Sequence, residues 1–252
     1  MMFIVADAHL EDGAELDGEF SAMLEALSHT DYDVLFLGDI MDLWIAKPRY
    51  EKECHRAFIR WCREESARRK VYFVEGNHEF FVAARHKDVF TMATTGRFRL
   101  GDALFVHGHL IQGKPWSFNR WFIPLSKSWL GSLVLTLMPC GQAFARRVKR
   151  ALGNRHPTPV LPEEEVRRWA ASLAAKGELH ELFLGHFHKG GEFRSKGVSP
   201  LSVRCAKQKD VLGGELELRC HALPAWKYHG EAALYAPETH SVTVGNWKEL
   251  LE

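Results

Sequence analysis

Residues 3–9 read Phe3-Ile4-Val5-Ala6-Asp7-Ala8-His9, a short apolar run that ends in an aspartate and a histidine. Runs rich in β-branched and aromatic residues are typical of buried strands. The same arrangement recurs four times, as Val34–Leu37 before Gly38-Asp39, Val71–Val74 before Gly76-Asn77-His78, Leu104–Val106 before His107-Gly108-His109, and Leu182–Leu184 before Gly185-His186-Phe187-His188. Because α/β folds gather their active sites at strand ends, we expect the five motifs to form one site.

The residue types in these motifs indicate a metal site. Carboxylates, an amide oxygen and several imidazoles suit borderline divalent ions such as manganese, iron, zinc, nickel or cobalt. The motifs lack the thiolates of a structural zinc site. Two such ions roughly 3.5–4 Å apart are used for in-line displacement at phosphorus. The sequence therefore predicts metal-assisted hydrolysis of a phosphoester.

Each motif taken alone also has a purely structural explanation. Asp or Asn beside Gly is common in turns, because these side chains bond to nearby backbone amides. The two His-x-His pairs are harder to explain in this way. Residues i and i+2 of a strand point to the same side, so we expect the two imidazoles of each pair to converge. Taken together, the motifs favour metal binding.

The order of the motifs resembles the calcineurin-like metallophosphoesterase superfamily, whose signature is D-x-H, G-D-x-x-D, G-N-H-[DE], H-x-H and G-H-x-H. The resemblance runs from residue 3 to about residue 188. The matching segments are Asp7-Ala8-His9, Gly38-Asp39-Ile40-Met41-Asp42, Gly76-Asn77-His78-Glu79, His107-Gly108-His109 and Gly185-His186-Phe187-His188.

This resemblance implies two divalent ions that share Asp39 as a bridging ligand. A shared anion offsets the repulsion between two dications at close range. The nucleophile would be a hydroxide that bridges the ions, its pKa lowered by coordination. His78 would not bind metal but would donate a proton or positive charge to the substrate. The implied ligands are Asp7, His9, Asp39 and His188 for one ion, and Asp39, Asn77, His107 and His186 for the other.

The roles of two further polar residues are left open by the sequence. Asp42 and His109 are candidates for groups that orient a ligating imidazole. Asp42 is equally well explained as the cap of a helix that starts before Leu43-Trp44.

Composition and pattern predict a two-sheet β-sandwich flanked by helices, in a single domain over residues 1–252. The net charge of +1 gives no reason to expect nucleic acid as a partner. No secretory signal is recognisable. The five cysteines (Cys54, Cys62, Cys140, Cys205 and Cys220) are expected to be reduced thiols. The predicted helices are 19–27, 51–69 and one that begins at Pro162, and strands at 216–220, 232–235 and 241–244 are expected to form an antiparallel second sheet.

An insertion at about residues 113–160, which we call the lid, adds aromatic and apolar residues followed by a basic cluster. The apolar segment Trp129–Cys140 is too short to span a bilayer. The lid is therefore either a helical hairpin packed on the sandwich or an apolar cap whose basic residues meet phosphates or an anionic membrane. The basic cluster comprises Arg146, Arg147, Lys149, Arg150 and Arg155.

The lid and the segment Leu223-Pro224-Ala225-Trp226 are similar to the UDP-2,3-diacylglucosamine hydrolases of lipid A synthesis. That family has G-N-R-D in place of Gly76-Asn77-His78-Glu79 and H-G-D in place of His107-Gly108-His109, which indicates this family or a paralogous branch. The resemblance implies a cytoplasmic enzyme that acts at the inner face of the membrane on a nucleotide-linked lipid, with manganese preferred. The alternative hypothesis is a soluble phosphodiesterase or phosphatase that acts on small phosphoesters. A third hypothesis is a non-catalytic scaffold.

Overall fold

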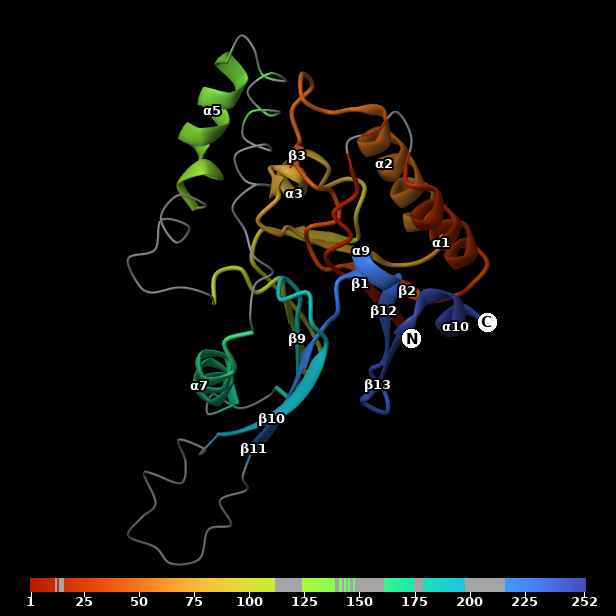
Figure 1. Ribbon diagram of the computed structural model, residues 1–252, viewed down its shortest axis with the longest axis vertical. Helices are drawn as coiled ribbons and strands as arrows, with labels where there is room; N and C mark the ends of the chain where they lie inside the picture. Colours follow the sequence, from red (N-terminus) through yellow and green to blue (C-terminus); the bar gives the residue numbers. More distant parts are fainter. Residues whose placement is uncertain are drawn as a thin grey trace, which may run out of the picture.

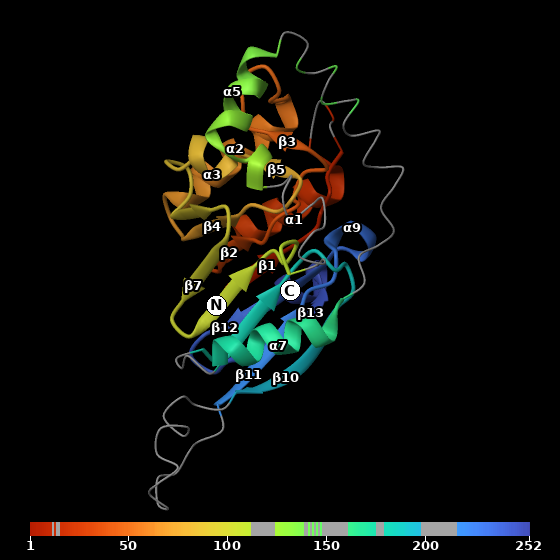
Figure 2. The same cartoon turned by 90° about the vertical axis from the view of Figure 1, so that its left-hand side faces the viewer.

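A computed structural model of the chain describes residues 1–11, 13, 16–111, 124–138, 141, 143, 145, 147, 161–174, 179–197 and 216–252. Two β-sheets pack face to face, and helices cover their outer sides (Figure 1). Helix α7 lies outside the second sheet, whereas α1 and α2 lie at the opposite side of the molecule (Figure 2). This mixed α/β sandwich confirms the predicted fold class.

The first sheet has the strand order β13-β12-β1-β2-β4-β6. Strands β1, β2, β4 and β6 run parallel, whereas β12 pairs antiparallel with both β1 and β13. The bounds are β1 Met2–Val5, β2 Asp33–Phe36, β4 Val71–Val74, β6 Met92–Thr94, β12 Glu231–Ala236 and β13 Ser241–Asn246.

The second sheet has the order β10-β11-β9-β8-β7. Its centre is parallel, with β9 between β8 and β11, and antiparallel strands close both edges. The bounds are β7 Arg97–Leu100, β8 Ala103–Val106, β9 Glu181–Leu184, β10 Gly191–Gly197 and β11 Leu216–Ala222.

Strand β1 shows why the central strands are apolar on both faces. Phe3 and Val5 pack into the core shared with α1 and α2, whereas Met2 and Ile4 pack between the two sheets. A parallel strand covered on both faces needs an unbroken apolar run. This is the reason that the five strand predictions based on such runs are confirmed.

Helix α1 (Gly18–Ser28) begins after Asp17, whose side chain accepts hydrogen bonds from the amides of Glu19 and Phe20. The other long helices confirm the predictions near 51–69 and 162. The remaining bounds are α2 Glu53–Ser66, α3 Val82–Arg85, α5 Trp129–Leu137, α7 Glu163–Ala174, α9 Trp226–His229 and α10 Trp247–Leu251, with a small parallel pair β3 Trp44–Ile45 and β5 Glu79–Phe80.

The C-terminal strands differ from their predicted arrangement. All three occur, but only β11 belongs to the second sheet, because β12 pairs with β1 and extends the first sheet together with β13. Alternation along a strand identifies its buried face but does not identify its neighbour. The expectation that these strands build the second sheet together is therefore wrong.

The described part of the lid contains helix α5, which agrees with the helix expected in the apolar segment. Leu135 is buried against Leu43, Ile45 and Tyr50. Much of the remaining apolar surface faces solvent, and Trp129 is 78% exposed. No helix among the described residues is long and apolar enough to cross a bilayer. The aromatic residues 116–123 and most of the basic cluster lie outside the described residues.

The cysteines that the structure describes agree with reduced thiols. Cys54, Cys62 and Cys220 are buried and form no disulfide. Burial raises the pKa of the Cys220 thiol to about 12. Cys140 and Cys205 lie outside the described residues.

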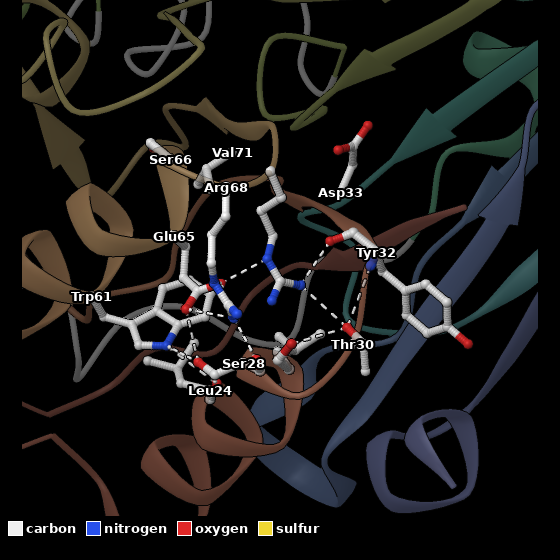
Figure 3. A network of polar contacts seen from close by, with 12 residues as sticks. Leu24, Ser28, Thr30, Tyr32, Asp33, Trp61, Glu65, Ser66, Arg68 and Val71 are labelled. Atoms are coloured by element: carbon white, nitrogen blue, oxygen red, sulfur yellow. Dashed lines mark hydrogen bonds and ion pairs between the residues drawn. The ribbon is translucent and has the colours of Figure 1, made fainter.

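A buried carboxylate joins the ends of α1 and α2. Glu65 is 5% exposed and accepts a hydrogen bond from Ser28 at 2.9 Å. The guanidinium of Arg69 lies 2.6 Å from Glu65, and that of Arg68 lies 2.9 Å from it. Figure 3 shows Glu65 among Ser28, Trp61 and Arg68, side chains from both helices and the segment after α2.

We expect Glu65→Gln to lower the free energy of unfolding by about 3 kcal/mol, because it leaves the buried guanidinium of Arg69 without its counter-ion. Chemical denaturation would measure the change. The control is Glu53→Gln, which removes an exposed carboxylate paired with Arg56 and Arg60 and should leave the midpoint unchanged. Equal midpoints for both variants would contradict a stabilising role for the buried pair.

Candidate metal centre

The five motifs follow strands that are neighbours in the two sheets. They come after β1, β2 and β4 of the first sheet and after β8 and β9 of the second. Each of these pairs of neighbouring strands is parallel, so their carboxyl ends lie at one edge. The topology therefore brings motifs that are up to 181 residues apart, Asp7 and His188, into one place.

The first group of side chains contains Asp7, His9 and His188. The Nε2 atoms of the two histidines are 3.1 Å apart. Oδ1 of Asp7 lies 3.8 Å from Nε2 of His9 and 3.5 Å from Nε2 of His188. Three potential ligand atoms thus face the same small space.

The second group contains Asp39, His107 and His186. Nε2 of His107 lies 3.2 Å from Oδ2 of Asp39 and 3.2 Å from the amide oxygen of Asn77. The same Oδ2 atom lies 4.0 Å from Nε2 of His9, a member of the first group. Asp39 therefore stands between the two groups.

The backbone of these motifs differs from the expected strand geometry. Residues Asp7, His9, Asp39, His186 and His188 all have positive φ, between 44° and 72°. Such left-handed conformations are uncommon outside glycine and concentrate at functional sites. His186 consequently joins Asp39 whereas His188 joins Asp7, and the expectation that the imidazoles of a His-x-His pair converge as they would on a strand is wrong for this pair.

Two glycines allow the loops to approach closely. A Cβ atom on Gly76 would lie 2.1 Å from Oδ1 of Asp39, and one on Gly38 would lie 2.5 Å from Nδ1 of His107. Gly38 also has φ +85°. Only glycine fits these two positions, which explains the Gly-Asp and Gly-Asn pairs in physical terms.

Glu79 connects the loop of Asp39 with the loop of Gly76, a role that was not predicted from the sequence. Its buried carboxylate accepts hydrogen bonds from the amides of Asp39 at 2.8 Å, Ile40 at 2.6 Å and Gly76 at 2.7 Å. Burial and the charge of Asp39 raise the pKa of Glu79 to about 7. The sequence signal was its position directly after Asn77-His78, within the motif itself.

The orientations of His107 and His78 are fixed by backbone carbonyls. Nδ1 of His107 lies 2.9 Å from the oxygen of Leu37, so that Nε2 faces the centre. Nδ1 of His78 lies 2.5 Å from the oxygen of Asp42, and its Nε2 lies 3.9 Å from Asp39. Hydrogen bonds of this kind set the tautomer of an imidazole that serves a metal site.

Asp42 and His109, whose roles the sequence left open, lie near the centre. Asp42 forms a group with His9 and His78, and no helix begins after it because Trp44–Ile45 is a strand. The helix-cap explanation of Asp42 is therefore wrong. The ring of His109 lies 5.4 Å from that of His107.

The electrostatics of the centre favour bound positive charge. Burial lowers the pKa of His107, but the carboxylates of Asp39 and Asp7 outweigh it and raise this pKa to about 9. Burial also raises the pKa of Asp39, but His107 and His78 bring it well below its usual value. For His9 and His186, burial dominates and lowers each pKa to about 4, which favours the neutral imidazoles that bind metals.

The donor atoms fit a divalent cation. Oδ1 of Asp7 is buried and has no hydrogen-bond partner among the described residues. A buried carboxylate oxygen without a partner is costly, and a cation is one way to satisfy it. The surrounding set of carboxylate oxygens, imidazole nitrogens and one amide oxygen is the type that borderline divalent ions prefer.

A cleft of about 500 Å³ adjoins the centre. His107 and His109 line it from the β8 side, and Trp169 and Glu165 line it from α7. The guanidinium of Arg97, also in the wall, lies 5.6 Å from the centre of the Trp169 ring. The cleft beside the centre is therefore partly apolar and contains the guanidinium of Arg97.

Comparisons with known proteins agree with this geometry. The calcineurin-like phosphoesterase family matches residues 2–190, a segment that contains all five motifs. No curated protein matches the sequence significantly. The match covers well over half of the chain, so the chain belongs to the calcineurin-like phosphoesterases, metal-dependent hydrolases that act on phosphoester bonds.

Proposed function

We propose that the centre holds two divalent ions that share Asp39. Asp7, His9 and His188 would complete one site, and Asn77, His107 and His186 the other. The observation that carries this assignment is the position of Oδ2 of Asp39, 4.0 Å from Nε2 of His9 and 3.2 Å from Nε2 of His107. When bound, the ions would lower the pKa of a water molecule and offset charge on the phosphoryl group. Manganese is our first choice, with iron, zinc, nickel and cobalt as alternatives.

His78 is proposed as the general acid. Burial lowers its pKa, but the charge of Asp39 and the carbonyl of Asp42 raise it above the usual value overall. A protonated imidazole is thereby favoured beside the reacting phosphorus. Because Nδ1 is engaged with Asp42, Nε2 is the atom available to give a proton to the leaving oxygen.

For the substrate, we propose an amphipathic phosphoester, with a nucleotide-linked acyl sugar such as UDP-2,3-diacylglucosamine as the first candidate. Support comes from α5, which presents Trp129, Leu133 and Leu137 to solvent. Apolar surface of this kind is typical of sites that receive apolar groups or touch membranes. The lid would meet the substrate at the inner face of the cytoplasmic membrane.

A small soluble phosphoester is the second candidate. The observation in its favour is that α5 is attached to the sandwich, because Leu135 is buried and its carbonyl accepts a hydrogen bond from Tyr50 at 3.0 Å. A helix held in this way also serves as a fixed cap. In that case the cleft beside His109 would receive the nucleotide or another leaving group.

We expect Asp39→Asn to abolish occupancy by both ions together with the activity, because it removes the charge of the shared ligand. Equilibrium dialysis against manganese followed by elemental analysis would measure occupancy. The control is Asp102→Asn, at the opposite end of β8, which should bind metal like the wild type. Two ions retained in Asp39→Asn would refute the bridging assignment.

We expect His78→Ala to retain both ions while the maximal rate falls roughly 10²–10⁴-fold, the usual contribution of a general acid. An aryl phosphodiester with a good leaving group should be affected less than an alkyl ester, because its leaving oxygen needs no proton. A rate equal to that of the wild type, or an equal loss for both esters, would argue against the assignment.

The substrate proposal is tested by release of UMP from UDP-2,3-diacylglucosamine in detergent with manganese. The double variant Leu133→Asp, Leu137→Asp should lose this activity but keep turnover of small aryl esters, because both side chains are exposed and their loss need not disturb folding. Val244→Asp, exposed on β13, is the control. No UMP release by the wild type, with small esters hydrolysed, would favour the second candidate.

A further inference from the structure

Lys127 of the lid reaches the loop that carries Asn77. It lies just before α5, and its side chain is only 10% exposed. Its Nζ atom donates a hydrogen bond to the carbonyl of Gly76 at 2.5 Å and lies 3.3 Å from Oε2 of Glu75. The ammonium group also lies 5.6 Å from the centre of the Phe80 ring. A lid cation is thus buried against the metal centre.

The partner carboxylate is itself fixed. Glu75 is fully buried, and its Oε1 atom accepts a hydrogen bond from the amide of Ala83 at 2.8 Å. The backbone amide of Glu75 donates to Thr94 at 2.8 Å. Because Glu75 is held at both ends, the position of Lys127 relative to β4 is defined by a charge-assisted contact with little freedom.

The peptide that Lys127 contacts is the one next to Asn77. Gly76 has no space for a side chain against Asp39, and its amide donates to Glu79. The amide oxygen of Asn77 lies 3.2 Å from Nε2 of His107. Because the Gly76 carbonyl belongs to the same planar peptide unit as the amide nitrogen of Asn77, the position of this carbonyl constrains the position of Asn77 relative to His107.

A second lysine offers a comparison. Nζ of Lys47 lies 2.5 Å from the hydroxyl of Ser132 in α5 and 5.2 Å from the Phe81 ring. This contact attaches the lid to the segment after β3, as Tyr50 does through Leu135. Both lysines connect the lid to the sandwich. Lys127 contacts the loop of the metal centre, whereas Lys47 contacts Ser132 and the ring of Phe81.

We propose that Lys127 is a positioning residue through which the lid sets the placement of Asn77 and thus the affinity of the metal site that Asn77 completes. The inference rests on the proposed function, which assigns Asn77 to that site. Partners of metal ligands commonly change metal affinity by about 10–100-fold when they are removed. The lid would then act on the centre as well as on the substrate.

The test compares Lys127→Met, Lys127→Arg and Lys47→Met in the full chain. Manganese titration by calorimetry is the first readout. Lys127→Met should weaken one of the two ions about 10–100-fold, the ion that Asn77 would bind, while the affinity for the other ion is retained. Lys127→Arg, which keeps the charge and the donors, should restore most of the affinity. Lys47→Met should bind both ions like the wild type.

Hydrogen exchange of residues 74–80, measured without added metal, is the second readout. Exchange should accelerate in Lys127→Met and remain unchanged in Lys47→Met. A wild type that binds fewer than two ions would contradict the proposed function, and the exchange result would still test the contact itself. Unchanged manganese affinity in Lys127→Met would overturn the inference whatever the exchange result, as would equal effects of the two Met variants.

Discussion

The carboxylate of Glu79 is the constraint on which the centre depends. It accepts hydrogen bonds from the backbone of two loops, the one with Asp39 and the one with Gly76. These loops approach so closely that a methyl group at Gly76 would collide with Asp39. Backbone amides at this distance need a shared acceptor, because an unsatisfied buried amide costs about 1–3 kcal/mol. Glu79 thus makes the close approach of the Asp39 loop and the Gly76 loop possible.

The fold and the membership of the centre could be predicted largely from local sequence. Unbroken apolar runs identified the central strands, because a strand covered on both faces has little choice of composition. The polar residues that follow those runs lie together at the carboxyl ends of the strands. Strand neighbours were less accessible, as β12 shows, since pairing with β1 depends on contacts more than 200 residues apart. The left-handed backbone at His186 and His188 could not be predicted from the sequence either, because it arises from tertiary packing rather than from residue type.

The lid contacts both the sandwich and the loop of the metal centre. Its described helix is attached through Leu135, Tyr50 and Lys47 at one side and reaches the centre through Lys127 at the other. The same helix leaves Trp129 and Leu137 in solvent. The same short element therefore presents apolar side chains to solvent and contacts the loop that carries Asn77. Under the two proposals above, one short segment would contact both the substrate and the loop of the metal centre.

Strand β1 joins parts of the chain that are far apart in the sequence. This strand, which leads to Asp7, lies between β2 and β12, and the amide of Lys227 contacts the carbonyl of Asp7 itself. Met2, Phe3 and Ile4 of this strand thus pair with residues 233–235, more than 200 residues further along the chain. The sheet around the first ligand-bearing segment is complete only when β12 is in place beside β1. The backbone position of Asp7 therefore depends on a segment that is remote from it in the sequence.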